Sequence, residues 1–109
     1  MAVSQDYLDF LMDQFSDFGE VAYKKMFGGA GFYKDGVMFG GIMYGELHLK
    51  VDDETRPLYE EQGMKPFSHG NKKAKTPPSY YCVPVDVVED REELTRWAER
   101  ALAAAKGRM

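Results

Sequence analysis

The residues that could do chemistry in this sequence of 109 residues are few and scattered. The chain has two histidines, His48 and His69, and one cysteine, Cys82. No Cys-x-x-Cys or His-x-x-x-His spacing links any two of them, so the sequence predicts no metal site. Cys82 lies between two tyrosines and Val83-Pro84, a setting typical of a buried strand thiol. We therefore expect no covalent catalysis by Cys82, and we expect His48 to be a solvated strand residue.

A glycine-rich segment, residues 28–34 (GGAGFYK), is a second place where chemistry could be sought. Phosphate-binding loops use glycine so that backbone N–H groups can approach phosphate, and a helix follows directly. Here the glycines precede a strand and a hairpin turn, and the Gly-x-Gly-x-x-Gly spacing fails at Lys34. We interpret them as points of close backbone packing, bends or a bulge in a curved sheet. The sequence thus predicts no cofactor, no catalytic residue and no enzyme.

A lysine-rich stretch is the feature that suggests binding. Residues 63–85 contain no Asp or Glu. The lysines of this stretch are Lys65, Lys72, Lys73 and Lys75. Tyr80 and Tyr81 follow, so the stretch could contact phosphates and stack bases. On a chain of net charge -4, such nucleic-acid binding would be weak and salt-sensitive. An acidic protein partner, or a merely solvated loop, accounts for the lysines equally well.

Residues 4–17 predict an amphipathic helix that begins at Ser4 and ends before Gly19. Apolar side chains gather on one face at helical spacing. The other face is acidic and carries Asp6, Asp9 and Asp13. Two interpretations stay open for this face: a solvated surface, or a docking surface for a basic partner.

The rest of the chain reads as strands with two further helices. Alternation and short turns predict antiparallel strands over 30–33, 37–43 and 47–51, with 21–27 as an extra strand. A short helix is expected from about Asp53 to Gln62, then strands over 64–69 and 79–83, and a closing helix capped by Asp90. The predicted order is α-β-β-β-α-β-β-α, in a single domain spanning residues 1–109.

Composition limits the setting. Hydrophobic residues make up 44% of the chain and charged residues 29%, which are ordinary globular values. No apolar run is long enough to span a bilayer, no secretory signal is visible, and a lone cysteine makes no disulfide, so we expect a cytoplasmic protein without membrane contact. The chain has seven Phe, seven Tyr and one Trp, which is a large number of aromatic side chains for a small core to bury. An exposed sheet face and a homodimer are therefore expected.

Four blocks of the sequence carry a family resemblance. They are residues 26–39 (MFGGAGFYKDGVMF), 49–53 (LKVDD), 79–84 (SYYCVP) and 97–102 (WAERAL). In this order they resemble the N-terminal domain of the TfoX/Sxy family of bacterial competence regulators. The resemblance implies a two-layer α+β domain with an antiparallel five-stranded sheet and helices on one side, similar to secretion-chaperone-like folds.

The resemblance also implies a function. The family is associated with competence, the uptake of DNA in transformation, and with assisting a transcription factor rather than with catalysis. No functional residues carry over from it. Because the sequence stops at Met109, where competence regulators of the family usually continue into a helical domain, we expect a standalone N-terminal domain. We predict a non-enzymatic regulatory module that contacts transcription machinery. The alternative is a weak, direct nucleic-acid binder that uses the Lys72–Lys75 loop.

Overall fold

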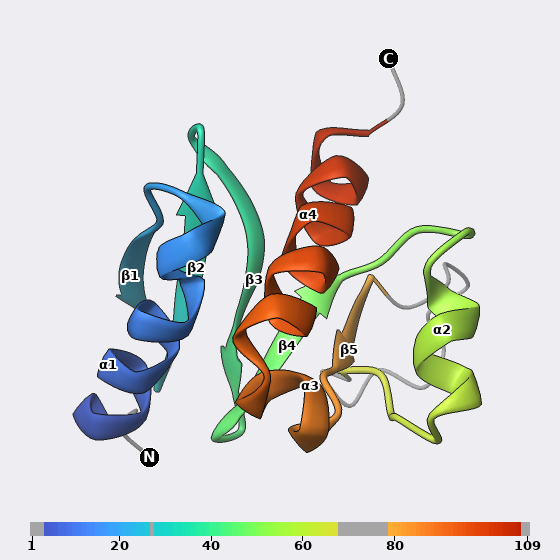
Figure 1. Ribbon diagram of the computed structural model, residues 1–109, viewed down its shortest axis with the longest axis horizontal. Coiled ribbons are helices and arrows are strands. Elements are labelled where there is room, and N and C mark those ends of the chain that lie inside the picture. The colour runs from blue at the N-terminus through green and yellow to red at the C-terminus, as the bar shows by residue number, and fades with distance from the viewer. Residues whose placement is uncertain (1–3, 27, 68–78, 108–109) are drawn as a thin grey trace.

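The computed structural model describes residues 4–26, 28–67 and 79–107 of the chain (Figure 1). Its elements, in chain order, are α1 (Gln5–Gln14), the 3-10 helix η1 (Phe15–Phe18), β1 (Ala22–Met26), β2 (Gly29–Lys34), β3 (Val37–Met43), β4 (Glu46–Lys50), α2 (Arg56–Glu61), β5 (Tyr80–Cys82), α3 (Val85–Glu89) and α4 (Arg91–Lys106). The strands form one antiparallel sheet in the order β1-β2-β3-β4-β5. The predicted α+β class with an antiparallel five-stranded sheet is confirmed.

The core lies between the sheet and the helical layer. In Figure 1, α4 crosses the sheet over β3 and β4, with α1 and η1 on one side of it and α3 at its start. An aromatic cluster joins the two layers, because the ring of Phe15 meets those of Phe32 and Phe39 edge to face at 5.2 and 5.4 Å. From α4, Leu94, Trp97, Ala98 and Ala101 complete the core.

Local capping chemistry sets the helix boundaries. Ser4 accepts a hydrogen bond from the backbone N–H of Tyr7 at the start of α1, as predicted. Asp90 likewise accepts from the N–H groups of Glu92 and Glu93 and begins α4. The α2 helix begins at Arg56, three residues later than predicted. The side chain of Asp52 accepts N–H bonds from residues 54 and 55, and so holds a turn ahead of the helix.

The two edges of the sheet differ from the sequence prediction. The segment predicted as an extra strand over 21–27 is the full edge strand β1. The described part of the predicted strand 64–69, residues 64–67, makes only an isolated bridge in which Pro66 faces Tyr81. Pro66 has no N–H to donate, but the carbonyl of Lys65 and the N–H of Phe67 both bond to β5. These residues therefore cover the outer edge of β5.

Two tight turns and three glycines shape the sheet. Asp35-Gly36 and Tyr44-Gly45 both have positive φ at their two residues, the conformation of a type I′ hairpin turn. A Cβ added at Gly29, Gly40 or Gly41 would lie 2.0–2.6 Å from a carbonyl oxygen of a neighbouring strand. The register of β2 on β3 also shifts between Phe32 and Tyr33, a bulge. The interpretation of the glycines as sites of close packing and a bulge is confirmed.

Candidate functional site

The sheet has a second face, away from the helical layer. Residues paired across antiparallel strands point to the same side, so the register separates the two faces. Phe32, Leu47 and Leu49 point into the core, whereas Met26, Met38, Met43, His48, Lys50 and Tyr80 point to the other side. In the described ranges the helices pack against the core side, where α2 joins them through Tyr59 and its contact with Trp97. We call the other side the open face.

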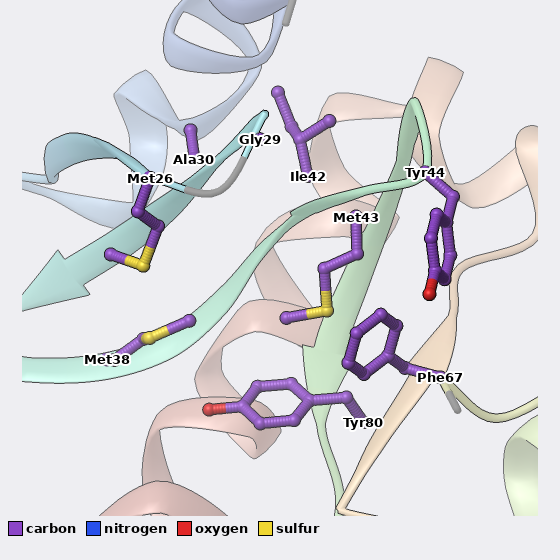
Figure 2. A pocket seen from close by; sticks show the side chains of 9 residues that line it. All are labelled: Met26, Gly29, Ala30, Met38, Ile42, Met43, Tyr44, Phe67 and Tyr80. Carbon is purple, nitrogen blue, oxygen red and sulfur yellow. The ribbon is translucent and has the colours of Figure 1, made fainter. Parts of the chain in front are cut away.

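The open face is hollowed by a cavity of about 660 Å³, within the roughly 300–1,000 Å³ typical of ligand pockets. Figure 2 shows the residues that line it, which come from β1, β2, β3, the turn after β3, the segment before residue 68, and β5. We define the open-face pocket by six residues: Met26, Met38, Met43, Tyr44, Phe67 and Tyr80. Gly29, Ala30 and Ile42 also line it. The lining is thus apolar, flexible and aromatic.

The methionines cover a glycine in the sheet. A Cβ added at Gly31 would lie 3.0 Å from Cε of Met26 and 3.3 Å from Sδ of Met38, so both thioethers rest over this glycine. Figure 2 shows Met26 and Met38 directed toward the same space, with Met43 beside the rings of Phe67 and Tyr80. Unbranched methionine side chains change rotamer easily and adapt to different contacts. This part of the pocket can therefore change shape by rotation of the methionine side chains alone.

The other wall of the pocket is aromatic. The rings of Tyr44 and Phe67 lie 5.4 Å apart, and Phe67 meets the ring of His48 at 5.8 Å and 79°. Burial, and next the neighbouring Tyr33, raise the pKa of Tyr80, so its hydroxyl stays protonated at neutral pH. Tyr33 is on β2 and Tyr80 on β5.

The placement of His48 corrects the sequence prediction. His48 does face away from Leu47 and Leu49, as the alternation requires, yet it is 6% exposed instead of solvated. Phe67 packs on its ring, and the Nδ1 atom of the ring lies 3.0 Å from the carbonyl oxygen of Glu46. Burial lowers the pKa of His48 below its usual 6.5, so the ring is neutral at pH 7. The covering residue lies 19 positions along the chain, beyond the reach of a local pattern.

Cys82 is the buried strand thiol that the sequence predicted. Its Sγ donates to Oε2 of Glu46, 2.7 Å away on β4. Burial first, and then this carboxylate, raise the pKa of the thiol to about 12. A thiol held protonated is a poor nucleophile.

Charge is distributed unevenly over the sheet. The strands contain four lysines and one acidic residue, Glu46, although the whole chain has a net charge of -4. Two of the lysines turn to the helical side: Lys25 donates to the side chain of Gln5, and Lys34 donates to the carbonyl of Phe18.

The other two strand lysines lie on the open face. Lys24 faces Gly31 in the register, and the Nζ atom of Lys50 is 5.3 Å from the ring of Tyr80. The one acidic side chain of the strands, Glu46, lies with Cys82 in a second pocket that Tyr7 and Phe10 of α1 also line. The open face is therefore apolar at its centre and basic around it.

The predicted interaction residues lie on different elements. Asp6, Asp9 and Asp13 are exposed on α1, as the helical spacing indicated. Asp13 pairs with Arg91 at 2.7 Å, and Asp9 accepts from the side chain of Gln5. Lys65 is exposed in the segment along β5, and within the described ranges it forms no hydrogen bond or ion pair with these aspartates. Lys72, Lys73 and Lys75 lie outside the described residues.

The open-face pocket was missed by the sequence interpretation. Met26, Met38 and Met43 come from three separate strand ends, and only the strand register brings them together. The sequence did offer one signal, the expectation that so many aromatics would leave a sheet face exposed.

Within residues 4–26, 28–67 and 79–107, no three His, Cys, Asp or Glu side chains are grouped so that they could hold a metal ion. Over the same ranges, none of the helices combines the length and apolar character needed to cross a bilayer.

The fold is that of a small α+β domain with an apolar pocket on the open face of its sheet. Comparison with known families makes this more specific: residues 13–105 match the family model described as the TfoX N-terminal domain. The chain therefore belongs to the TfoX N-terminal domain family, and the resemblance read from its sequence is confirmed. This family is of regulatory type and is not a known enzyme family, so the chain is a competence-regulator-like module. None of the curated proteins compared with the chain matches it.

Proposed function

We propose that this protein is a non-enzymatic regulatory module of bacterial competence that acts in the cytoplasm through contacts with a protein of the transcription machinery. The observation that carries the proposal is the open-face pocket in a domain of a regulatory family. Its apolar lining of methionines and aromatic rings is of the kind that adaptable protein-binding surfaces use.

The chemistry of the buried polar groups supports a binding role over a catalytic one. Cys82 is protonated and its neighbour Glu46 is engaged with it, so the pair lacks an activated nucleophile. His48 is neutral and covered by Phe67. Each of these groups has a structural partner inside the domain.

The proposal is tested by measuring transcripts in the native bacterium. Deleting the gene should change expression of competence genes, and the wild-type gene should restore it. A gene encoding Phe67→Ser should restore expression poorly, because the substitution removes an apolar wall of the pocket. Val85→Ser is the control, since Val85 is an exposed apolar residue that lies on α3 and does not line the pocket. Unchanged competence transcripts after deletion would refute the proposal.

The alternative function, weak and direct binding of nucleic acid through the Lys72–Lys75 loop, has a separate test. Fluorescence anisotropy with double-stranded DNA at about 50 and 200 mM salt should give an affinity that falls steeply with salt. Replacing Lys72, Lys73 and Lys75 by glutamine should abolish that affinity. If no binding occurs at the lower salt concentration, or if it ignores salt, the alternative is excluded.

A further inference from the structure

The position of the open-face pocket restricts what can occupy it. The pocket lies on a sheet face, where the backbone N–H and C=O groups of the strands are already paired with one another. At the far edge, the backbone of β5 is covered by Lys65 and Phe67. A segment that docks on this face receives no backbone hydrogen bonds from the sheet. It must satisfy its own, and an α-helix does so within one segment.

The lining indicates which side chains that helix presents. Three methionines and three aromatic rings make up most of the lining, so the complementary surface is a row of large apolar side chains. The thioethers of Met26 and Met38 lie over Gly31 and can rotate away without moving the backbone. The open face can therefore accommodate a row of apolar side chains through rotation of these methionines, without movement of the sheet backbone.

Charge complementarity indicates which charged side chains lie beside the apolar face of the docked helix. Lys24 and Lys50 lie on the open face, and Lys65 is exposed two residues before Phe67. The acidic side chain that the strands contribute, Glu46, lies outside the open-face pocket, in a second pocket with Cys82 and with Tyr7 and Phe10 of α1. A helix with carboxylates beside its apolar face would neutralise these lysines, whereas a basic helix would be repelled.

The geometry points to one occupant: an amphipathic α-helix of a partner protein, with large apolar side chains toward the sheet and carboxylates along its flanks. This inference rests on the proposed function, since it names the chemistry of the partner that the regulatory module contacts. Tyr44 supports it, because the turn after β3 holds this tyrosine at φ 55° with 79% of its surface exposed beside Phe67. A bulky residue in this backbone conformation is rare, and such outliers concentrate at functional positions.

The test is a selection with two displayed peptide libraries against the whole protein. One library randomises a single face and its flanks on a helical scaffold of about 15 residues, and the other carries the same positions on a proline-broken, extended scaffold. We expect binders from the helical library, with large apolar residues on the randomised face and Asp or Glu enriched beside them. Binders from the extended library alone would overturn the inference and favour strand addition at the outer edge of β1, the first strand of the sheet. An absence of binders, or flanks enriched in lysine, would also overturn it.

Two substitutions on the same strand provide a matched control. Lys24→Glu should weaken binding of a selected peptide by about threefold to tenfold, because Lys24 lies on the open face. Lys25→Glu makes the same charge change on the helical side and should alter the affinity by less than about twofold. Equal effects of the two would contradict the placement of the peptide. Phe67→Ser should reduce the affinity further than Lys24→Glu does.

The result of the peptide selection can be distinguished from the result of the transcript test of the proposed function. If the selection fails while competence transcripts depend on Phe67, the helix inference is wrong and the regulatory function stands. If selected peptides bind the open face while the transcripts ignore the gene, the surface is a helix-binding site in a protein with another role. A second copy of this chain as the occupant would be detected as a dimer in light scattering that Phe67→Ser dissolves, and it would overturn the assignment to a partner helix.

Discussion

Tyr44 and Phe67 pack together at the open-face pocket, with ring centroids 5.4 Å apart, although they approach it from different segments of the chain. Tyr44 reaches this position from the first site of a left-handed turn, with φ 55°, followed by Gly45 at φ 79°. Type I′ turns favour Asn-Gly or Asp-Gly because these residues tolerate left-handed backbone conformations. Tyr44 therefore destabilises this turn relative to an asparagine or aspartate at the same position.

Replacing Tyr44 with asparagine should therefore stabilise the folded protein. Relief of left-handed strain should outweigh the loss of the contact with Phe67, and the net gain should be about 0.5–1 kcal/mol in the free energy of unfolding. Urea denaturation monitored by circular dichroism measures it. Binding of a peptide selected on the open face should weaken in the same variant.

The first hairpin provides the control for this substitution. Asp35 has φ 56° before Gly36, nearly the same conformation as Tyr44, but already with a residue that suits the turn. Asp35→Asn should change the free energy of unfolding by less than about 0.5 kcal/mol, even though it removes the exposed pair with Lys106. A destabilised Tyr44→Asn protein would contradict the strain argument.

The glycines of the sheet should respond differently to alanine. A Cβ at Gly41 would lie 2.5 Å from the carbonyl oxygen of Ala30, which a paired strand cannot move, whereas a Cβ at Gly31 meets only methionine side chains. We expect Gly41→Ala to cost about 3 kcal/mol or more, and Gly31→Ala to stay within about 1 kcal/mol of the wild type.

Denaturation curves of the two alanine variants under identical conditions make this comparison. Each variant adds one methyl group at neighbouring, paired positions, so the difference between them reports only what the added group meets. Equal losses of stability in the two variants would contradict the prediction. They would mean that the side chains of Met26 and Met38 move aside no more readily than a backbone carbonyl group does.

Features set by a few adjacent residues were predictable from the sequence. The Ser4 and Asp90 caps and the Asp35-Gly36 turn depend on side chains and backbone conformations within one turn. The buried stripe of α4 also follows from spacing alone, because helical periodicity fixes which residues share a face.

Features that depend on contacts between distant segments were not predictable in this way. The burial of His48 requires Phe67, and the start of α2 depends on Asp52 holding a turn before it. The open-face pocket requires the registers of four strand pairs to be known together. Of the residues nominated as interaction sites, Lys65 borders this face, whereas the aspartates of α1 lie on the helical layer.

Stability should fall as the pH is lowered through the titration of His48. Burial lowers the pKa of His48 in the folded protein, so below pH 6.5 the unfolded chain binds the proton more readily. The contribution of His48 is therefore fully present above pH 6.5 and is lost as the pH falls toward the lowered pKa. The free energy of unfolding in urea at pH 7.5, 6.5 and 5.5 measures this loss.

His48→Asn isolates the contribution of the histidine. The amide nitrogen of asparagine can replace Nδ1 as a donor to the carbonyl of Glu46, but the side chain does not titrate. The variant should be about 1 kcal/mol less stable at pH 7.5 because it loses the ring contact with Phe67, and its stability should decline less on acidification. Parallel curves for the two proteins would show that other groups cause the acid sensitivity.

Cys82 should react slowly with thiol reagents, and Glu46 should contribute to the protection. A thiol whose pKa is about 12 holds far less thiolate at pH 8 than a free cysteine with a pKa near 8.5, so labelling by Ellman's reagent should be about 100-fold slower or more than in the urea-unfolded chain. Glu46→Gln removes the negative charge beside Sγ, lowers the pKa of the thiol and should speed labelling, while burial keeps the rate below that of the unfolded chain. Glu99→Gln, on the exposed face of α4, should leave the rate unchanged. If Glu46→Gln labels no faster than the wild type, burial alone protects the thiol and the carboxylate has no part in it.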